Sequence, residues 1–156
     1  MRDDLGEITL MDSSREMLRV ADEKIRASGS DNLRTLFHDL SGKQYTEDRF
    51  DLIFCQMVLH HIPDVEDIIL KFHSLLNPGG YLAIADLYPE DGSFHGEGFD
   101  GHKGFDPEEL SVRLTRAGFE DTNYMKCFTI NKKTADESLK PFDLFLLVAK
   151  RKPDQP

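Results

Sequence analysis

Short apolar runs alternate along this chain with segments whose apolar residues recur every three or four positions. The short runs, typical of β-strands, are residues 7–11, 33–37, 50–55 and 81–87. The amphipathic segments, typical of helices, begin near Ser13, Pro63 and Asp106. Strands that alternate with single helices are typical of a parallel sheet built from right-handed β-α-β units. The alternation therefore excludes an all-α or an all-β fold.

The last two predicted strands, residues 122–130 and 142–150, have only a charged turn between them. Two strands joined by a turn pair antiparallel, so we expect a hairpin at one edge of the sheet. The predicted fold class is α/β: a doubly wound, mostly parallel sheet with an antiparallel edge hairpin. A chain of 156 residues is the size of one such domain, which we assign to residues 1–156.

Local patterns refine this prediction. Ser-Ser-Arg-Glu at residues 13–16 is a capping box that opens the first helix. The continuous apolar run at 50–55 favours a strand buried on both faces. Asn-Pro-Gly-Gly at 77–80 predicts a turn, and the aperiodic segment 88–105 is the longest predicted loop.

The charge of the chain limits its partners. Its 29 acidic residues against 19 Lys and Arg give a net charge of −10, which repels nucleic acid and anionic lipid. No apolar run approaches the roughly 20 residues that span a bilayer, so we expect no membrane segment and a cytoplasmic protein. Cys55 and Cys127 belong to no C-x-x-C pair and are interpreted as buried, reduced thiols.

Candidate binding residues follow the predicted strands, because ligands of open α/β sheets bind beyond the carboxyl ends of the strands. Asp12 closes the first strand. It either accepts hydrogen bonds from both ribose hydroxyls of a nucleoside or caps the following helix. Asp39 follows the second strand and either caps a turn or accepts from an adenine amino group. Gln56 and Met57 follow the third strand, and residues 86–88 follow the fourth.

Two adjacent histidines, His60 and His61, lie between a predicted strand and helix. An imidazole there is either a general base, for which its ordinary pKa near 6.5 is suitable, or part of an exposed pair that ends the strand. His95 lies in the long loop with other acids and histidines, in a segment that equally resembles a mobile lid. We therefore predict no metal site.

Taken together, four segments resemble class I S-adenosylmethionine-dependent methyltransferases. They are 8–21 (ITLMDSSREMLRVA), 33–40, 50–62 (FDLIFCQMVLHHI) and 75–86 (LLNPGGYLAIAD). Residues 92–95 and 104–106 resemble a branch of the family that acts on small molecules. The resemblance covers nearly the whole chain and implies a Rossmann-like fold, with S-adenosylmethionine as the cofactor and a small molecule as the methyl acceptor.

The resemblance also implies roles for individual residues. The ribose is held by Asp12 and the neighbouring Ser13, and the adenine by Asp39 and Leu40, with Met17 packed near it. Gln56 and Met57 line the methyl-transfer site. His61 is the candidate base, and His60 and His95 are candidate substrate contacts.

One part of the family pattern is missing from the sequence. The family's first strand and its Asp/Glu-x-Gly-x-Gly loop precede the ribose acid by about 20 residues, whereas Gly6 is the one glycine before Asp12. In the family's sheet order that strand lies between the strands that end at Asp12 and at Cys55. Either these two strands close up, or another chain covers the gap in a homo-oligomer, or the sequence is shortened, which is our expectation.

We therefore predict a methyltransferase that is impaired in this shortened chain. The alternative is a non-catalytic methyltransferase-like module that acts through its exposed sheet edge. A dinucleotide-dependent oxidoreductase is disfavoured, because no G-x-G-x-x-G directly follows a predicted strand and opens a helix; the one match to this pattern, at residues 96–101, lies within the long loop.

Overall fold

The computed structural model describes residues 5–154. The chain divides into two compact units, Met1–Tyr45 and Thr46–Pro156, which are described separately below. The first unit holds β1 (Ile8–Asp12), α1 (Arg15–Ser28) and β2 (Leu33–Phe37). The second unit holds β3 (Phe50–Gln56), the short 3₁₀ helix η2 (Leu59–His61), α2 (Val65–Leu75), β4 (Leu76–Leu87), α3 (Pro107–Arg116), β5 (Phe119–Lys133) and β6 (Leu139–Arg151).

The first unit is a single β-α-β motif. Strands β1 and β2 pair in parallel from Ile8 opposite Leu33 to Asp12 opposite Phe37, and α1 connects them. The helix ends at Gly29, whose φ of 63° is the left-handed conformation favoured at this position. Its N-cap is Ser14 rather than Ser13, because the Ser14 hydroxyl accepts from the Met17 amide at 3.3 Å. The N-cap is therefore one residue later than predicted, and because Met17 then stands at N3 in place of Glu16, its side chain cannot return the second bond of a capping box.

The second unit is a mixed sheet with the strand order β3-β4-β6-β5. Strands β3 and β4 are parallel, and β6 is antiparallel to both β4 and β5. The strand that contains Cys55 therefore lies beside the strand that contains residues 81–87. The predicted final hairpin is confirmed, and β5 is the edge strand.

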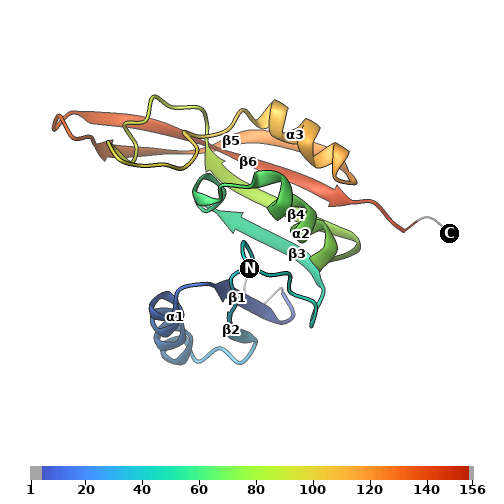
Figure 1. Cartoon of the computed structure of the whole chain (residues 1–156). Coiled ribbons are helices and arrows are strands. Elements are labelled where there is room, and N and C mark those ends of the chain that lie inside the picture. Colours follow the sequence, from blue (N-terminus) through green and yellow to red (C-terminus); the bar gives the residue numbers. More distant parts are fainter. Residues whose placement is uncertain (1–4, 155–156) are drawn as a thin grey trace. The chain divides into compact units, whose positions relative to one another are not determined.

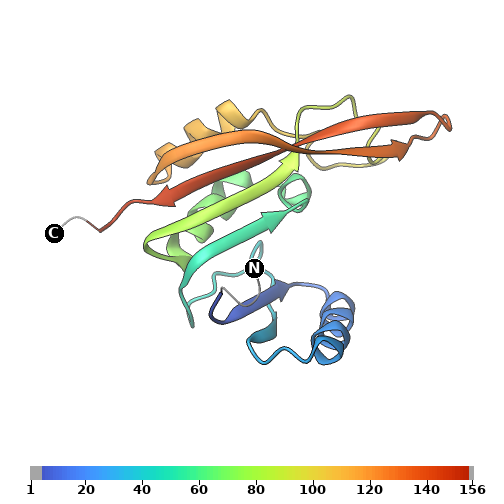
Figure 2. The same ribbon diagram turned by 180° about the vertical axis from the view of Figure 1, so that it is seen from behind.

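Helices α2 and α3 lie on the same face of this sheet, in front of it in Figure 1 and behind it in Figure 2. Alternate residues of β4 face them, so that Leu82 and Ile84 are fully buried. Ile69 of α2 and Leu114 of α3 are also fully buried, which places the core between the helices and the sheet. Asp64 and Asp106 cap the two helices by accepting from backbone amides in the first turn.

The prediction that 50–55 is buried on both faces is wrong. On β3, Leu52 is 48 % exposed and Phe54 is 57 % exposed. Figure 2 shows the reason, because no helix of the second unit covers this face of the sheet. A continuous apolar run indicates a strand, but it does not determine whether both of its faces are covered.

The predicted turn at 77–80 is a bulge within β4. Strand β3 pairs with β4 on both sides of it, since Phe50 faces Leu76 and Leu52 faces Tyr81. A Cβ at Gly80 would lie 3.0 Å from the Asp51 carbonyl oxygen. Glycine at position 80 therefore lets the bulged backbone approach β3 closely.

The two sheets are separate within residues 5–154, because β1 pairs only with β2 and β3 pairs only with β4. Two separate sheets are compatible with the missing first strand. Among the described residues, no helix is long and apolar enough to cross a membrane. The single domain over residues 1–156 remains a prediction.

Candidate active site

Asp12 is the last residue of β1 and is half-buried. One carboxylate oxygen, Oδ1, accepts from the Ser14 amide at 2.7 Å. For Oδ2, the structure shows no donor among residues 5–154. Asp12 therefore stabilises the turn into α1 and still has a lone acceptor oxygen at the strand end. Ser13 beside it and Met17 in the first turn of α1 are both exposed.

Asp39 forms a turn of its own two residues after β2. Its Oδ1 accepts from the Ser41 hydroxyl at 2.6 Å, the Ser41 amide at 3.0 Å and the Gly42 amide at 3.2 Å. The Ser41 hydroxyl, and then the Gly42 amide, hold the pKa of Asp39 below its usual value. The turn interpretation of Asp39 is thus confirmed, whereas an adenine contact by Asp39 and half-buried Leu40 remains a prediction.

Strand β3 ends in a backbone conformation that is rare for methionine. Met57 has φ 52°, in the left-handed region, which costs roughly 1–2 kcal/mol for a residue with a Cβ. Its amide donates to the Ala85 carbonyl at 2.8 Å, and its side chain packs on a cluster that contains Leu87 and Phe94. The chain turns at Met57, directly after β3. Exposed Gln56 and half-buried Met57 therefore lie at the carboxyl end of this strand.

The histidine pair after β3 divides into one buried and one exposed side chain. His60 is 1 % exposed, and its Nδ1 lies 2.6 Å from Oδ1 of Asp86, which is fully buried near the end of β4. The Asp86 carboxylate also accepts from the amides of Leu87 at 2.7 Å and of His60 at 3.3 Å. Because a carboxylate can only accept, His60 carries its proton on Nδ1 and presents the lone pair of Nε2.

The long loop brings His95 to that lone pair. The Nε2 atoms of His60 and His95 lie 3.0 Å apart, and the His61 ring centroid is 5.0 Å from that of His95. His95 also stacks on Phe99, with ring centroids 4.0 Å apart. His60, His61 and His95 therefore form one cluster, which we call the histidine cluster.

The two surface members of this cluster, His61 and His95, have pKa values below the ordinary value, and partial burial is the main cause. It lowers the pKa of His61, and the neighbouring His60 lowers it further, whereas Asp86 acts in the opposite direction. Burial also makes the largest contribution to lowering the pKa of His95. The neighbouring His60, His61 and Lys132 lower it further. Both imidazoles are therefore neutral at pH 7 and able to accept a proton.

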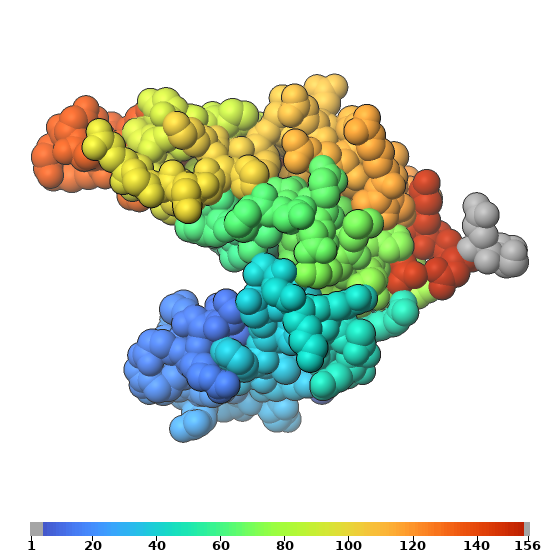
Figure 3. Space-filling view, in the orientation of Figure 1, coloured from blue at the N-terminus to red at the C-terminus, as the bar shows by residue number. Residues whose placement is uncertain are grey.

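The hairpin of β5 and β6 positions the loop that carries His95. Lys132 on β5 donates to the Phe94 carbonyl, and Lys140 on β6 pairs with Asp91. Figure 3 shows this loop at the surface of the second unit, in yellow, beside the orange-red end of the hairpin. The hairpin thus fixes the loop from one side, and the bonds from Phe105 to Leu87 and from His102 to His60 fix it along the backbone.

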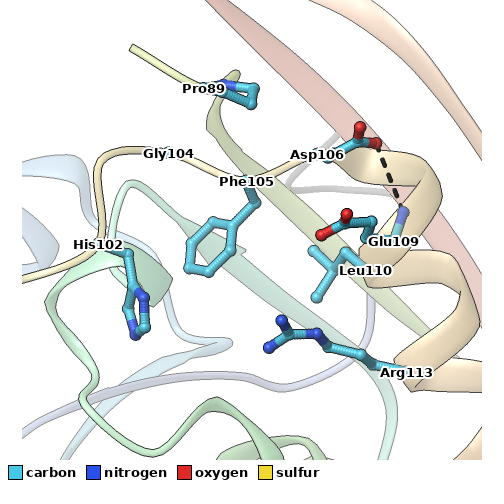
Figure 4. A pocket seen from close by; sticks show the side chains of 8 residues that line it. All are labelled: Pro89, His102, Gly104, Phe105, Asp106, Glu109, Leu110 and Arg113. Carbon is cyan, nitrogen blue, oxygen red and sulfur yellow. Dashed lines mark hydrogen bonds between the residues drawn. The ribbon is translucent and has the colours of Figure 1, made fainter. Parts of the chain in front are cut away.

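A pocket of about 410 Å³ lies on the other side of this loop. Figure 4 shows the Phe105 ring between His102 and the α3 side chains Leu110 and Arg113. The remaining lining residues are Pro89, Gly104, Asp106 and Glu109. The pocket contains none of the residues predicted from the sequence to bind cofactor or substrate.

The structure brings together three of the predicted site residues, His60, His61 and His95. Asp86, the buried partner of His60, was named in the sequence only as a strand end. Its position in the sequence could have indicated a buried partner. Asp86 lies within the apolar run 81–87, and an acid in such a run is costly to bury unless it has a partner. Asp12, Ser13, Met17, Asp39 and Leu40 belong to the first unit, and Gln56 and Met57 to the second.

Comparison with known proteins identifies the family. A family model described as a methyltransferase domain matches residues 2–141. An uncharacterized methyltransferase of Schizosaccharomyces pombe is 31 % identical over 120 residues, which cover 67 % of this chain and 42 % of that protein. The chain thus spans less than half the length of this relative.

Solved structures show the same fold at low identity. A methyltransferase from Bacillus halodurans, described as putative in the name of its structure, has a TM-score of 0.72 at 18 % identity, covering 94 % of this chain and 83 % of that one. The N-methyltransferase NodS from Bradyrhizobium japonicum, solved with S-adenosyl-L-homocysteine, has a TM-score of 0.66 at 21 % identity. The match covers 93 % of this chain and 66 % of the NodS chain. These structures share the fold of this chain. The family match over residues 2–141 establishes that the chain belongs to the methyltransferase-domain family.

Proposed function

We propose that this chain binds S-adenosylmethionine and methylates a nucleophilic oxygen, nitrogen or carbon of a small molecule. The observation that carries the proposal is the position of polar side chains at the carboxyl ends of β1, β2, β3 and β4. This is where ligands of open α/β sheets bind, and the family match extends over all four strands. The net charge of −10 disfavours nucleic acid as the acceptor.

The cofactor supplies a methyl group on a sulfonium, which passes to the acceptor as the acceptor loses a proton. In the first unit, the lone Oδ2 of Asp12 fits a ribose hydroxyl, and Ser13 lies next to it. Asp39 and Leu40 are assigned to the adenine, with Met17 beside it. Because Asp39 already accepts from Ser41 and Gly42 through Oδ1, its Oδ2 is the atom assigned to the adenine amino group.

In the second unit, Gln56 and Met57 are assigned to the methyl-transfer site. The strained backbone of Met57 supports this assignment, since such strain persists where surrounding structure over-determines it and often accompanies function. His61 is the proposed base, because it is exposed and neutral at pH 7. His60 and His95 are the proposed contacts to the acceptor.

We expect the 156-residue chain to bind the cofactor weakly. The sequence lacks the Asp/Glu-x-Gly-x-Gly loop, and with it several hydrogen bonds to the charged methionine end, worth roughly 1.5–3 kcal/mol each. Isothermal titration calorimetry with S-adenosylhomocysteine tests this expectation. A micromolar dissociation constant for the bare chain would contradict it.

The binding site itself is tested by NMR during titration to millimolar S-adenosylhomocysteine. We expect saturable shifts of the amides near Asp12, Asp39 and Met57, and a loss of those shifts in Asp12→Asn. The amide oxygen of Asn can accept from the Ser14 amide as the Asp12 carboxylate does, so this variant should keep its melting temperature. Shifts that persist unchanged in Asp12→Asn would remove Asp12 from the site, and no shift at these three positions would refute the proposal.

A second candidate function is a non-catalytic module that associates with a second copy of itself. Exposed Leu52 and Phe54 on the uncovered face of β3, and the single pairing of that strand, favour it. Sedimentation velocity at increasing concentration tests this candidate. We expect a dimer that Phe54→Asp abolishes, and a chain that remains monomeric at 100 µM would exclude it.

A further inference from the structure

The histidine cluster has a geometry that a protein uses to hold a transition-metal ion. One nitrogen from each of His60, His61 and His95 lies within 4.8 Å of the others. Around tetrahedral Zn²⁺, with Zn–N bonds of 2.0–2.1 Å, two ligand nitrogens are roughly 3.4 Å apart. His60 and His95 already place their Nε2 atoms 3.0 Å apart. We propose that these three histidines form a binding site for Zn²⁺.

The buried member is oriented as a metal ligand requires. Asp86 accepts the Nδ1 proton of His60 at 2.6 Å, so the Nε2 lone pair faces His95. A carboxylate behind a ligating imidazole fixes its tautomer and raises its basicity, and it is a common partner of zinc-bound histidine. The Leu87 amide fixes Asp86 in turn, at 2.7 Å. This supporting shell is fully buried and is in place without an ion.

The other two ligands reach the site from the surface. His61 and His95 are exposed, and the proposal requires a rotation of the His61 side chain that brings its nitrogen closer to the other two. The Phe99 stack and the Lys132 bond to Phe94 hold His95 in place. Three nitrogen ligands on an exposed face leave a fourth position for water, the arrangement of open zinc sites.

Charged groups of both signs lie next to the cluster. The Asp86 carboxylate lies behind His60, the Glu90 carboxylate accepts from the Phe94 amide, and Lys132 is the neighbouring cation. The Lys132 amine is engaged by the Phe94 carbonyl and lies 4.4 Å from the centre of the Phe94 ring. An ion at the cluster uses the nitrogen of His61, so His61 acts as a base only in the metal-free chain. The zinc titration needs neither cofactor nor methyl acceptor, so its outcome does not depend on whether methyl transfer occurs.

The test is calorimetric titration of ZnCl₂ into a tag-free chain stripped with EDTA, at pH 7.5. We expect one Zn²⁺ per chain and a loss of affinity of at least about tenfold in His95→Ala and in His61→Ala. Asp86→Asn is expected to weaken binding by about 10–100-fold, as for other second ligand shells. Circular dichroism of each variant shows whether it is folded. If Asp86→Asn unfolds, the variants His95→Ala and His61→Ala, which change exposed residues, still test the proposal.

Two matched controls distinguish this site from adventitious binding. His38→Gln changes a histidine of the first unit, and Cys127→Ser removes the exposed thiol. Both should bind Zn²⁺ as the unmodified chain does, and Co²⁺ should give the visible absorption of a tetrahedral site without a thiolate band. Absence of one-to-one binding overturns the proposal. So does binding that His95→Ala leaves unchanged, because the histidines would then form only a hydrogen-bonded pair.

Discussion

Breaking the buried pair of Asp86 and His60 should destabilise the second unit strongly. Asp86→Leu leaves three buried donors without an acceptor: the His60 ring N–H and the amides of His60 and Leu87. Each unpaired buried donor costs roughly 1–3 kcal/mol, of which Leu burial offsets a part. We expect a net loss of about 3–5 kcal/mol, a large fraction of the roughly 5–15 kcal/mol that stabilises a domain. His60→Phe should cost about as much, because it leaves the carboxylate buried without its partner.

The double variant distinguishes a coupled pair from two independent residues. If the losses were additive, Asp86→Leu with His60→Phe would cost about 6–10 kcal/mol. Because the buried acceptor and its ring donor are then both replaced by apolar side chains, we expect about 3–5 kcal/mol, a coupling of at least about 2 kcal/mol. Urea unfolding followed by far-UV circular dichroism measures this, since the chain has no tryptophan. As a control, Lys126→Ala breaks an ion pair with Asp143 that is about half exposed, and should leave the free energy of unfolding nearly unchanged. Additive losses would refute the coupling.

Further predictions concern the loop, the thiols and a histidine outside the cluster. Gly104→Ala should lower the melting temperature more than Gly96→Ala: both residues have positive φ, but only at Gly104 would a Cβ overlap the Tyr88 carbonyl. At pH 8, Ellman's reagent should modify exposed Cys127 and leave Cys55 unmodified, because burial raises the pKa of Cys55 to about 12; rapid reaction of two thiols in the folded chain would contradict this. His73 should titrate below its ordinary value of about 6.5 by NMR, since burial and then Arg151 lower its pKa. The unfolded chain then binds the proton first, so His73 lowers stability as the pH falls below about 6.5; a midpoint above 6.5 would contradict this.

Local patterns in the sequence predicted most elements of this fold because strands and helices have different periods. The apolar positions of α2 recur at helical spacing, and Ile68, Ile69 and Phe72 are buried as expected. The N-cap of α1 is Ser14 and not Ser13, so the pattern located the start of this helix only to within one residue. The two adjacent serines carry the same hydroxyl, and the sequence alone does not distinguish them. Only backbone geometry determines which of them reaches the Met17 amide.

Features that depend on distant residues could not be predicted in the same way. The exposure of Phe54 depends on which face of the sheet the helices cover, and the run 50–55 is apolar on both. The contact between His60 and His95 spans 35 positions and depends on the path of a loop without periodicity. Each histidine was therefore recognised as a candidate, whereas their assembly and the partnership of His60 with Asp86 were not.

The carboxyl ends of β3 and β4 contain several features that packing alone does not explain. Met57 has a left-handed backbone, Asp86 is a fully buried acid, and the loop beyond β4 returns over Tyr88 only because position 104 is glycine. Each of these features lowers the stability of the fold. An apolar residue in place of the buried acid, or a relaxed turn in place of the strained backbone, would not have this cost. Local violations of this kind tend to mark functional sites, because selection retains them for what they bind. Their joint position, more than any single residue, supports the proposal that the chemistry of the second unit takes place at this end of its sheet.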